Sequence, residues 1–246
     1  MADYLYGVNP VREALLGVGR KPQELLTARG ERSVRLAELL ALAEQQRLKI
    51  SHLERRDLER LAGHSHHQGV LLRLEPFTYI AFPDLLAAWR ASERPARFLL
   101  LDGITDPHNF GAILRSAEVA GCLGVIVPKD RSCPVSPVVE KTAAGALSHL
   151  PLCQVTNLSR AIDELKQAGI WCYGLAGDAA AQNLYTTDLT GDLALVVGSE
   201  GKGLRPNVRS HCDGLLAIPM RGRVASLNAS VAAAVALFEV LRQTGQ

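Results

Sequence analysis

The chain has 246 residues, of which 48% are hydrophobic and 21% are charged, and its formal net charge is +2. This length can build one large core or two smaller ones. No apolar run approaches the roughly 18 to 20 residues needed to span a bilayer, and the opening MADYLYGVNP lacks the features of a secretory signal. We therefore expect a soluble cytoplasmic protein, for which net charge gives only weak support for nucleic-acid binding.

Neither the cysteines nor the histidines predict a metal site. The five cysteines are odd in number and widely spaced, and no CxxC pair occurs, so we expect free thiols. Three histidines cluster in GHSHHQG, namely His64, His66 and His67. Because no cysteine or carboxylate accompanies them at ligand spacing, we predict that the protein binds no metal.

The N-terminal third reads as a small domain of mixed helices and strands. Within VRLAELLALAEQQ, the apolar residues Leu36, Leu39, Leu40 and Ala43 share one helical face. We predict an α/β domain over residues 1–75. Residues 76–96 contain three prolines and a short amphipathic piece, so we predict a linker there.

From residue 97 to 246, strand and helix patterns alternate. Continuous apolar runs predict strands at RFLLLDG, GVIVP, 170–175, 193–197 and 215–218, and helices are expected over 110–120, 137–147, 158–168 and 227–242. Continuous apolar strands are typical of a parallel sheet covered on both faces. The fold class predicted for this part is therefore α/β.

Polar residues follow the first of these strands in DGITDPHNFGAILR. Asn109 precedes the apolar run and is a favoured residue for a helix N-cap. Arg115 lies four residues after Gly111, within a helix otherwise made of apolar residues. This position suggests a guanidinium that reaches into a cleft, and the alternative is an arginine that extends to water.

A glycine-rich loop follows another strand in LALVVGSEGKGLRP. Gly198, Gly201 and Gly203 surround Ser199 and Glu200, so the backbone can approach a ligand closely. The loop matches neither GxGxxG nor GxxxxGK[ST], which disfavours a dehydrogenase or a nucleoside triphosphatase. Alternatively, the loop is a tight turn with Glu200 in the first turn of a helix.

A third polar cluster occurs in IPMRGRVASLNASVAAAV. Ser226 alone would be an adequate N-cap, but Asn228 and Ser230 follow it directly. Polar groups beyond three separate strand ends are typical of a ligand crevice in an α/β sheet.

The segments NFGAILR, GSEGKGL and IPMRGRVASLNAS resemble the three signature motifs of the SpoU/TrmH family of SPOUT methyltransferases. YGVNPVREAL, HQG and VPKDRS further resemble members that methylate a guanosine ribose of 23S ribosomal RNA. The resemblance implies a trefoil-knotted methyltransferase domain with a parallel sheet, a homodimer, and an N-terminal RNA-binding domain. It also implies that S-adenosylmethionine is held by Leu175, Ala176, Gly177, Gly198, Ile218, Met220 and Leu227.

The resemblance also implies roles for the polar residues, and we expect the product to be a 2′-O-methylated guanosine. Arg115 is a poor base because a guanidinium stays protonated in proteins. We expect it to stabilise the developing alkoxide or a neighbouring phosphate, while Asn109 and Asn228 orient the ribose. Glu200 and Ser226 are further site residues that could be mainly structural. The alternatives are an enzyme acting on transfer RNA, one that confers antibiotic resistance, and a non-catalytic RNA-binding protein.

Overall fold

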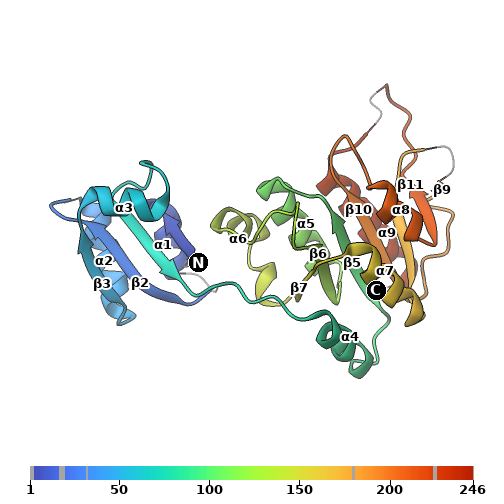
Figure 1. Cartoon of the computed structure of the whole chain (residues 1–246), viewed down its shortest axis with the longest axis horizontal. Helices are drawn as coiled ribbons and strands as arrows, with labels where there is room; N and C mark the ends of the chain where they lie inside the picture. The colour runs from blue at the N-terminus through green and yellow to red at the C-terminus, as the bar shows by residue number, and fades with distance from the viewer. Residues whose placement is uncertain (1–2, 17–19, 32, 179–180, 224–225, 246) are drawn as a thin grey trace. The chain divides into compact units, whose positions relative to one another are not determined.

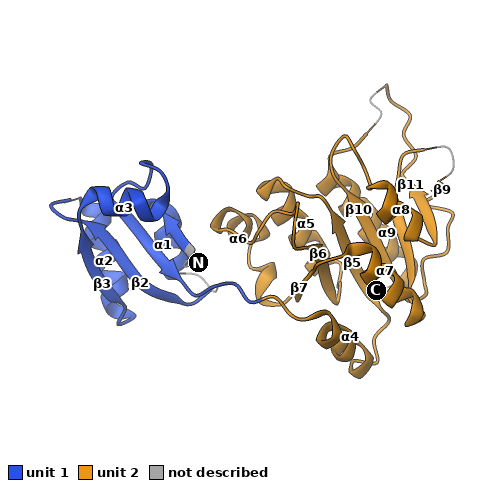
Figure 2. Ribbon diagram, in the orientation of Figure 1, with its two compact units in different colours: residues 1–78 blue, residues 79–246 orange. Residues whose placement is uncertain are grey.

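The computed structural model describes residues 3–16, 20–31, 33–178, 181–223 and 226–245. The chain divides into two compact units, Met1–Thr78 and Tyr79–Gln246, which Figure 2 shows in different colours. Each unit has its own sheet and its own buried core.

The first unit contains a four-stranded sheet in the order β1-β4-β2-β3. Strand β4 pairs antiparallel with β1 and β2, and β2 pairs parallel with β3. Its elements are β1 (Asp3–Tyr6), α1 (Val8–Leu16), β2 (Pro22–Ala28), α2 (Val34–Gln45), β3 (Lys49–Leu53), α3 (Arg55–Ala62) and β4 (Val70–Leu74), and Figure 1 labels all of them except β1 and β4.

Helices cover both faces of this sheet. Apolar residues of α1 and α2 form one cluster with the strands, and Leu58 of α3 packs with Leu26 and Leu71 in another. The face predicted for residues 36–43 is confirmed, because Leu36, Leu39 and Ala43 are buried and Leu40, which is half-buried, packs against the same cluster.

The second unit is built on a seven-stranded sheet in the order β7-β6-β5-β10-β8-β11-β9, and every neighbouring pair is parallel. Its strands are β5 (Arg97–Asp102), β6 (Gly124–Pro128), β7 (Leu152–Val155), β8 (Trp171–Leu175), β9 (Gln182–Asn183), β10 (Leu193–Gly198) and β11 (Gly214–Ala217). Its helices are α4 (Phe82–Ala91), α5 (Pro107–Val119), α6 (Pro137–Ala143), α7 (Leu158–Gln167), α8 (Pro206–His211) and α9 (Ala229–Thr244). The predicted α/β class and parallel sheet are confirmed.

The central strands of this sheet are buried on both faces. Phe98 and Leu100 of β5 pack with apolar residues of α4 and α7. Leu99 and Leu101 point to the opposite face and are also fully buried. On this unit, α5 packs against α9, and α9 contacts β10. Burial on both faces explains why these strands read as continuous apolar runs.

The segment 76–96, which the sequence predicts as a linker, contains helix α4. Phe82, Leu85 and Leu86 of this helix are buried in the core of the second unit. Ile80 pairs alongside β7 through a single parallel bridge to Cys153. Pro83 lies at the beginning of α4 and Pro95 follows the turn after its end, and the second unit begins at Tyr79.

One predicted helix is interrupted. The expected helix over 137–147 ends at Ala143, and a short 3₁₀-helix, Ala146–Ser148, follows. Ala144 and Gly145 both have positive φ, of 49° and 91°, which an α-helix does not accommodate.

The cysteines are free thiols, as predicted. Burial raises the pKa of Cys122 and Cys172 to about 12, so neither is a thiolate at neutral pH. Among the described residues, no helix combines the length and apolar character that crossing a bilayer requires.

Candidate functional site

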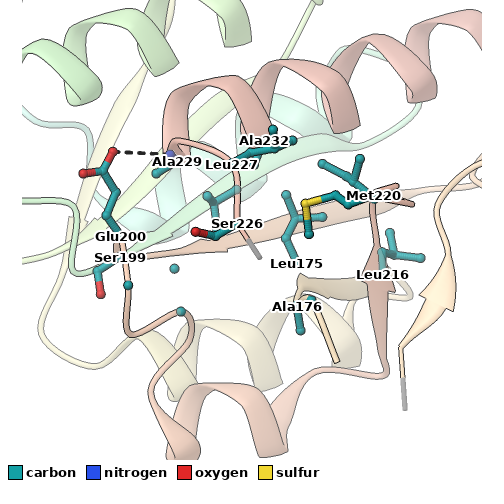
Figure 3. A pocket seen from close by; sticks show the side chains of 16 residues that line it. Leu175, Ala176, Ser199, Glu200, Leu216, Met220, Ser226, Leu227, Ala229 and Ala232 are labelled. Carbon is teal, nitrogen blue, oxygen red and sulfur yellow. Dashed lines mark hydrogen bonds between the residues drawn. The ribbon is translucent and has the colours of Figure 1, made fainter. Parts of the chain in front are cut away.

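A pocket of about 360 Å³ lies at the carboxyl ends of β8, β10 and β11. This is the sheet edge at which parallel α/β sheets bind ligands. Figure 3 shows side chains from three strand ends and from the beginning of α9 around one space. The lining residues are Leu175, Ala176, Gly177, Val197, Gly198, Ser199, Glu200, Gly201, Gly203, Leu216, Ile218, Met220, Ser226, Leu227, Ala229 and Ala232.

This pocket brings together every residue that the family resemblance assigned to the cofactor. All seven line it, although they come from segments around residues 175, 198 and 218–227. Glu200 and Ser226, assigned to the reaction, line it as well. Ser199, Gly201 and Gly203, named above as the glycine-rich loop, line it too. Sequence reasoning missed the remaining lining residues, which are Val197, Leu216, Ala229 and Ala232.

Gly198 ends β10 where two backbone segments meet. A Cβ on Gly198 would lie 2.2 Å from the carbonyl carbon of Gly203 and 2.4 Å from the amide nitrogen of Leu204. Ser199 and Gly203 exchange backbone hydrogen bonds of 2.9 and 3.1 Å, which close the loop into a tight bridge. Glycine is thus required at position 198 because the loop folds back directly onto it.

The far side of this loop is fixed by a buried carboxylate. Asp102, at the end of β5, is 1% exposed. Its Oδ2 accepts a hydrogen bond of 2.8 Å from the Arg205 backbone N–H, and its Oδ1 accepts one of 2.6 Å from Nε of the same arginine. Sequence reasoning did not single out this pair, although an aspartate directly after an apolar strand was visible. The pair fixes the loop between β10 and α8.

Two asparagine side chains and one backbone N–H converge at Glu200. Oε1 of Glu200 accepts hydrogen bonds from Nδ2 of Asn109 at 2.7 Å and from Nδ2 of Asn228 at 2.5 Å. Nδ2 of Asn228 also donates to Oδ1 of Asn109 at 2.9 Å. The Ala229 backbone N–H lies 3.4 Å from the same Oε1, the bond drawn in Figure 3. Three residues expected at the site therefore form one network, in which Oε2 of Glu200 has no partner among the described residues.

The helix caps differ from two expectations. The N-cap of α5 is Asp106, whose carboxylate accepts a 2.7 Å bond from the Asn109 backbone N–H, so the Asn109 side chain is released to reach Glu200. The N-cap of α9 is Asn228, whose Oδ1 accepts from the backbone N–H groups of Ser230 and Val231. Ser226 lies before the helix and lines the pocket instead.

Arg115 lies on α5 with an exposed side chain, and it has no hydrogen bond or ion pair to any described residue. It does not line the pocket of its own chain as far as the structure describes the lining. Gly111, one turn before it, is buried against α6, where an added Cβ would lie 2.5 Å from Cβ of Thr142. The glycine therefore allows close helix packing rather than access to a cleft.

The residues present fit S-adenosylmethionine. Aliphatic side chains of Leu175, Leu216 and Ile218 offer apolar walls for an adenine ring. The Glu200 carboxylate supplies a negative charge near which a sulfonium cation is favoured. No group of three or more metal-ligating side chains was found in the part of the chain that the structure describes.

Comparison with known protein families gives two matches. Residues 96–238 match the model of the SpoU rRNA Methylase family. Residues 4–80 match a model described as RNA 2'-O ribose methyltransferase substrate binding. Together they account for the pocket-bearing unit and for most of the first unit.

The chain is also similar to characterised proteins along nearly its full length. It is 44% identical over 241 residues to the 23S rRNA (guanosine-2'-O-)-methyltransferase RlmB of Pseudomonas putida, covering 98% of this chain and 96% of that protein. It is 42% identical to the protein of the same name from Escherichia coli K12, covering 99% of each. Among solved structures, it is similar to the SpoU methyltransferase AviRb from Streptomyces viridochromogenes in complex with the cofactor AdoMet, with a TM-score of 0.66, 29% identity, and coverage of 98% of this chain and 89% of that one.

Proposed function

The chain belongs to the SpoU rRNA methylase family, and from this membership we propose that it methylates the ribose 2′-hydroxyl of a guanosine in 23S ribosomal RNA. It is an S-adenosylmethionine-dependent RNA methyltransferase. The observation that carries the proposal is the Asn109–Glu200–Asn228 network at the edge of a pocket lined by all seven expected cofactor residues.

The cofactor, when bound, supplies a methyl group on a cationic sulfur. Gly198 lets the loop 199–203 fold back onto the end of β10 and so shapes one wall of the pocket, and Leu175, Ile218 and Leu227 would shield the bound cofactor from water. Excluding water strengthens the electrostatic interactions that act on the reacting groups.

The ribose hydroxyl is a poor nucleophile while it is protonated, so it must be oriented and helped to lose its proton. Asn109 and Asn228 hold each other and Glu200 in one geometry before the RNA arrives. We assign them to orienting the ribose. The remaining oxygen of Glu200 is available to accept a hydrogen bond from the hydroxyl, and Ser226 offers a second polar contact.

Arg115 is assigned to stabilising negative charge that develops on the ribose oxygen or lies on the neighbouring phosphate. Arginine serves this role because its planar guanidinium can bridge two oxygens and stays charged. Since Arg115 does not line the described pocket of its own chain, we propose that it acts at the pocket of a second subunit in a homodimer.

Helix α9 supports the homodimer. Its Val231 and Phe238 are spaced by seven residues on one face and are 47% and 45% exposed. Ala234 and Val235 lie between them and are only half-buried. An exposed apolar helix face of this kind is typical of an interface between subunits.

The two units have different proposed roles. The first unit is assigned to RNA binding, which its match to a substrate-binding model supports. The second unit is assigned the trefoil knot that the family resemblance implies, around the pocket. The protein is expected where bacterial ribosomal RNA precursors are, in the cytoplasm.

The test is direct. Purified full-length protein, labelled S-adenosylmethionine and 23S rRNA from cells that lack the gene are combined, and ribose methylation is mapped by resistance of the modified linkage to alkaline cleavage. We expect one guanosine to gain a 2′-O-methyl group. Methylation of transfer RNA alone, or of no RNA, would contradict the proposal. Light scattering at micromolar concentration tests the dimer, which a monodisperse active monomer would exclude.

A further inference from the structure

The loop 63–69 of the first unit carries a row of rings that the reaction described above does not use. Ring centroids of Tyr6 and His64 lie 4.2 Å apart with the planes at 70°, and those of His64 and His66 lie 6.1 Å apart with the planes at 31°. Tyr6 is 40% exposed, and His66 is exposed. An open aromatic surface therefore stands at one end of the β1–β4 sheet edge.

We propose that Tyr6, His64 and His66 form a stacking platform that binds an unstacked nucleobase of the RNA substrate. The proposal rests on the proposed function and deepens it by naming the contact. Sequence-specific RNA recognition uses single-stranded bases splayed onto tyrosine, histidine and other flat side chains. Stacking tolerates any base, because every base has a π-face.

The loop that presents the platform is rigidly built. His67 is fully buried, and its Nδ1 accepts a 3.1 Å hydrogen bond from the Gly69 backbone N–H. Burial lowers the pKa of His67, so the ring is neutral at physiological pH. The Gln68 side chain accepts a 3.0 Å bond from the Val8 backbone N–H and so connects the loop to α1. A platform fixed before binding loses little conformational entropy when the base stacks on it.

The rings are also held relative to one another. The His66 backbone N–H donates a 3.2 Å hydrogen bond to Nδ1 of His64. The edge-on contact with Tyr6 supports the other side of His64. Because the backbone rather than the side chain of His66 makes this bond, the His66 ring can be replaced without removing it.

Arginines flank the platform. Glu31 lies beside Gly69, where an added Cβ would be 3.1 Å from its carboxylate, and Arg55 pairs with Glu31 at 3.6 Å. Arg29 lies on the same loop as Glu31, and the side chains of Arg55 and Arg29 are 60% and 67% exposed. Exposed ion pairs are weak, so these guanidiniums can exchange their carboxylates for RNA phosphates. Stacking and phosphate contacts together make a typical single-strand site.

The test uses full-length protein and a 23S rRNA transcript as the probe. His66→Ala is expected to weaken RNA binding about tenfold, within the range expected for removing one stacked aromatic side chain. His66→Phe keeps a flat ring and removes the nitrogen atoms, so it should bind within about twofold of wild type. His149→Ala removes an exposed histidine of the second unit and is the matched control.

The salt dependence of binding separates stacking from charge. His66→Ala should lower affinity by the same factor at every salt concentration, because a stacked base displaces no counterion. Arg55→Ala should instead reduce the slope of log affinity against log salt by about one. Wild-type affinity in His66→Ala, or a loss in His66→Phe equal to that in His66→Ala, would overturn the platform.

The cofactor affinity and the methyl-transfer rate at saturating RNA distinguish the platform from the proposed function. Both should stay at the wild-type value in His66→Ala. If wild-type protein transferred no methyl group to 23S rRNA, the proposed function would fail, whereas the platform is judged from RNA affinity alone.

Discussion

Asn109 and Glu200 are 91 residues apart in the chain, yet Nδ2 of Asn109 donates a 2.7 Å hydrogen bond to Oε1 of Glu200. The bond joins the beginning of α5 to the loop after β10, because β5 and β10 are parallel neighbours and both end at the same edge of the sheet. It places an amide that could have served as a helix cap at the pocket instead, and Asp106 does the capping.

Glu200→Ala should lower the methyl-transfer rate about 10-fold to 100-fold. The substitution removes the acceptor of both asparagine side chains, and hydrogen bonds to charged groups are worth about 1.5–3 kcal/mol. Glu200→Gln keeps one acceptor oxygen and should retain part of the rate. The measurement is single-turnover methylation at saturating RNA, with Glu118→Gln on α5 as control. A wild-type rate in Glu200→Ala would assign this carboxylate to folding alone.

Arg115→Ala should lower the same rate by roughly 100-fold to 1,000-fold, as removing one preorganised donor does in oxyanion holes. Cofactor affinity should be nearly unchanged, because Arg115 is assigned to negative charge on the RNA and not to the cofactor. Folding should survive, since alanine is a strong helix former. Arg115→Lys should recover only part of the rate, because lysine lacks the planar fork. Full turnover in the alanine variant would remove Arg115 from the mechanism.

Gly198→Ala should abolish measurable cofactor binding. The new Cβ would meet the Gly203 and Leu204 backbone at 2.2–2.4 Å, so the loop must move out of its bridge. Gly191→Ala is the matched control, because a Cβ there meets nothing within 4 Å. Calorimetry measures affinity, and circular dichroism checks that each variant is folded. Tight binding by a folded Gly198→Ala protein would show that the bridge does not shape the pocket.

Two fragments should differ in stability. A fragment from residue 79 keeps α4, whereas one from residue 96 exposes the core surface that Phe82, Leu85 and Leu86 cover. Removing three buried apolar side chains costs several kcal/mol, at about 1.5–3 kcal/mol for each. We expect residues 79–246 to bind S-adenosylmethionine and to methylate RNA poorly. Denaturant unfolding compares the two fragments, and equal midpoints would show that α4 contributes nothing to the fold.

Glu24 should contribute stability that depends on pH. Burial of this carboxylate raises its pKa, but Lys49, Ser51 and Arg73 outweigh burial and hold the pKa below the usual 4.5. The unfolded chain thus binds the proton more readily, so the contribution is complete above pH 4.5 and is lost as the pH falls below that value.

At pH 7, Glu24→Gln is expected to lower the free energy of unfolding by about 1–3 kcal/mol, so this variant should unfold at a lower denaturant concentration than wild type. This difference in free energy of unfolding should become smaller as the pH falls below about 4.5. Glu38→Gln removes the charge of an exposed ion pair with Arg12, and its free energy of unfolding should stay close to that of wild type at every pH tested. A difference for Glu24→Gln that stays constant down to pH 3 would refute the assignment.

Sequence patterns predicted the elements whose burial is uniform. Strands such as Leu193–Gly198 are buried on both faces, so their continuous apolar letters could be read directly. The helix face of Leu36, Leu39 and Ala43 was equally legible, because its period matches the α-helix. Helix α4 was missed as part of a core because the prolines in and around it resemble a linker, and only its packing in the tertiary structure reveals that Phe82 and Leu85 are buried.

For the candidate site, too, the sequence predicted one part and the tertiary structure decided the rest. The sequence by itself determined that the three polar segments belong together, because each follows a strand end and the carboxyl ends of parallel strands share one edge. The cofactor residues came from the family resemblance. Only the tertiary structure decided what each does: that Asp106 caps α5 in place of Asn109, and that Asp102 fixes Arg205. Whether a cap or a buried ion pair forms depends on differences of a few tenths of an ångström in the distances between polar atoms. Local propensity leaves such distances undetermined, since several nearby polar residues satisfy it equally well.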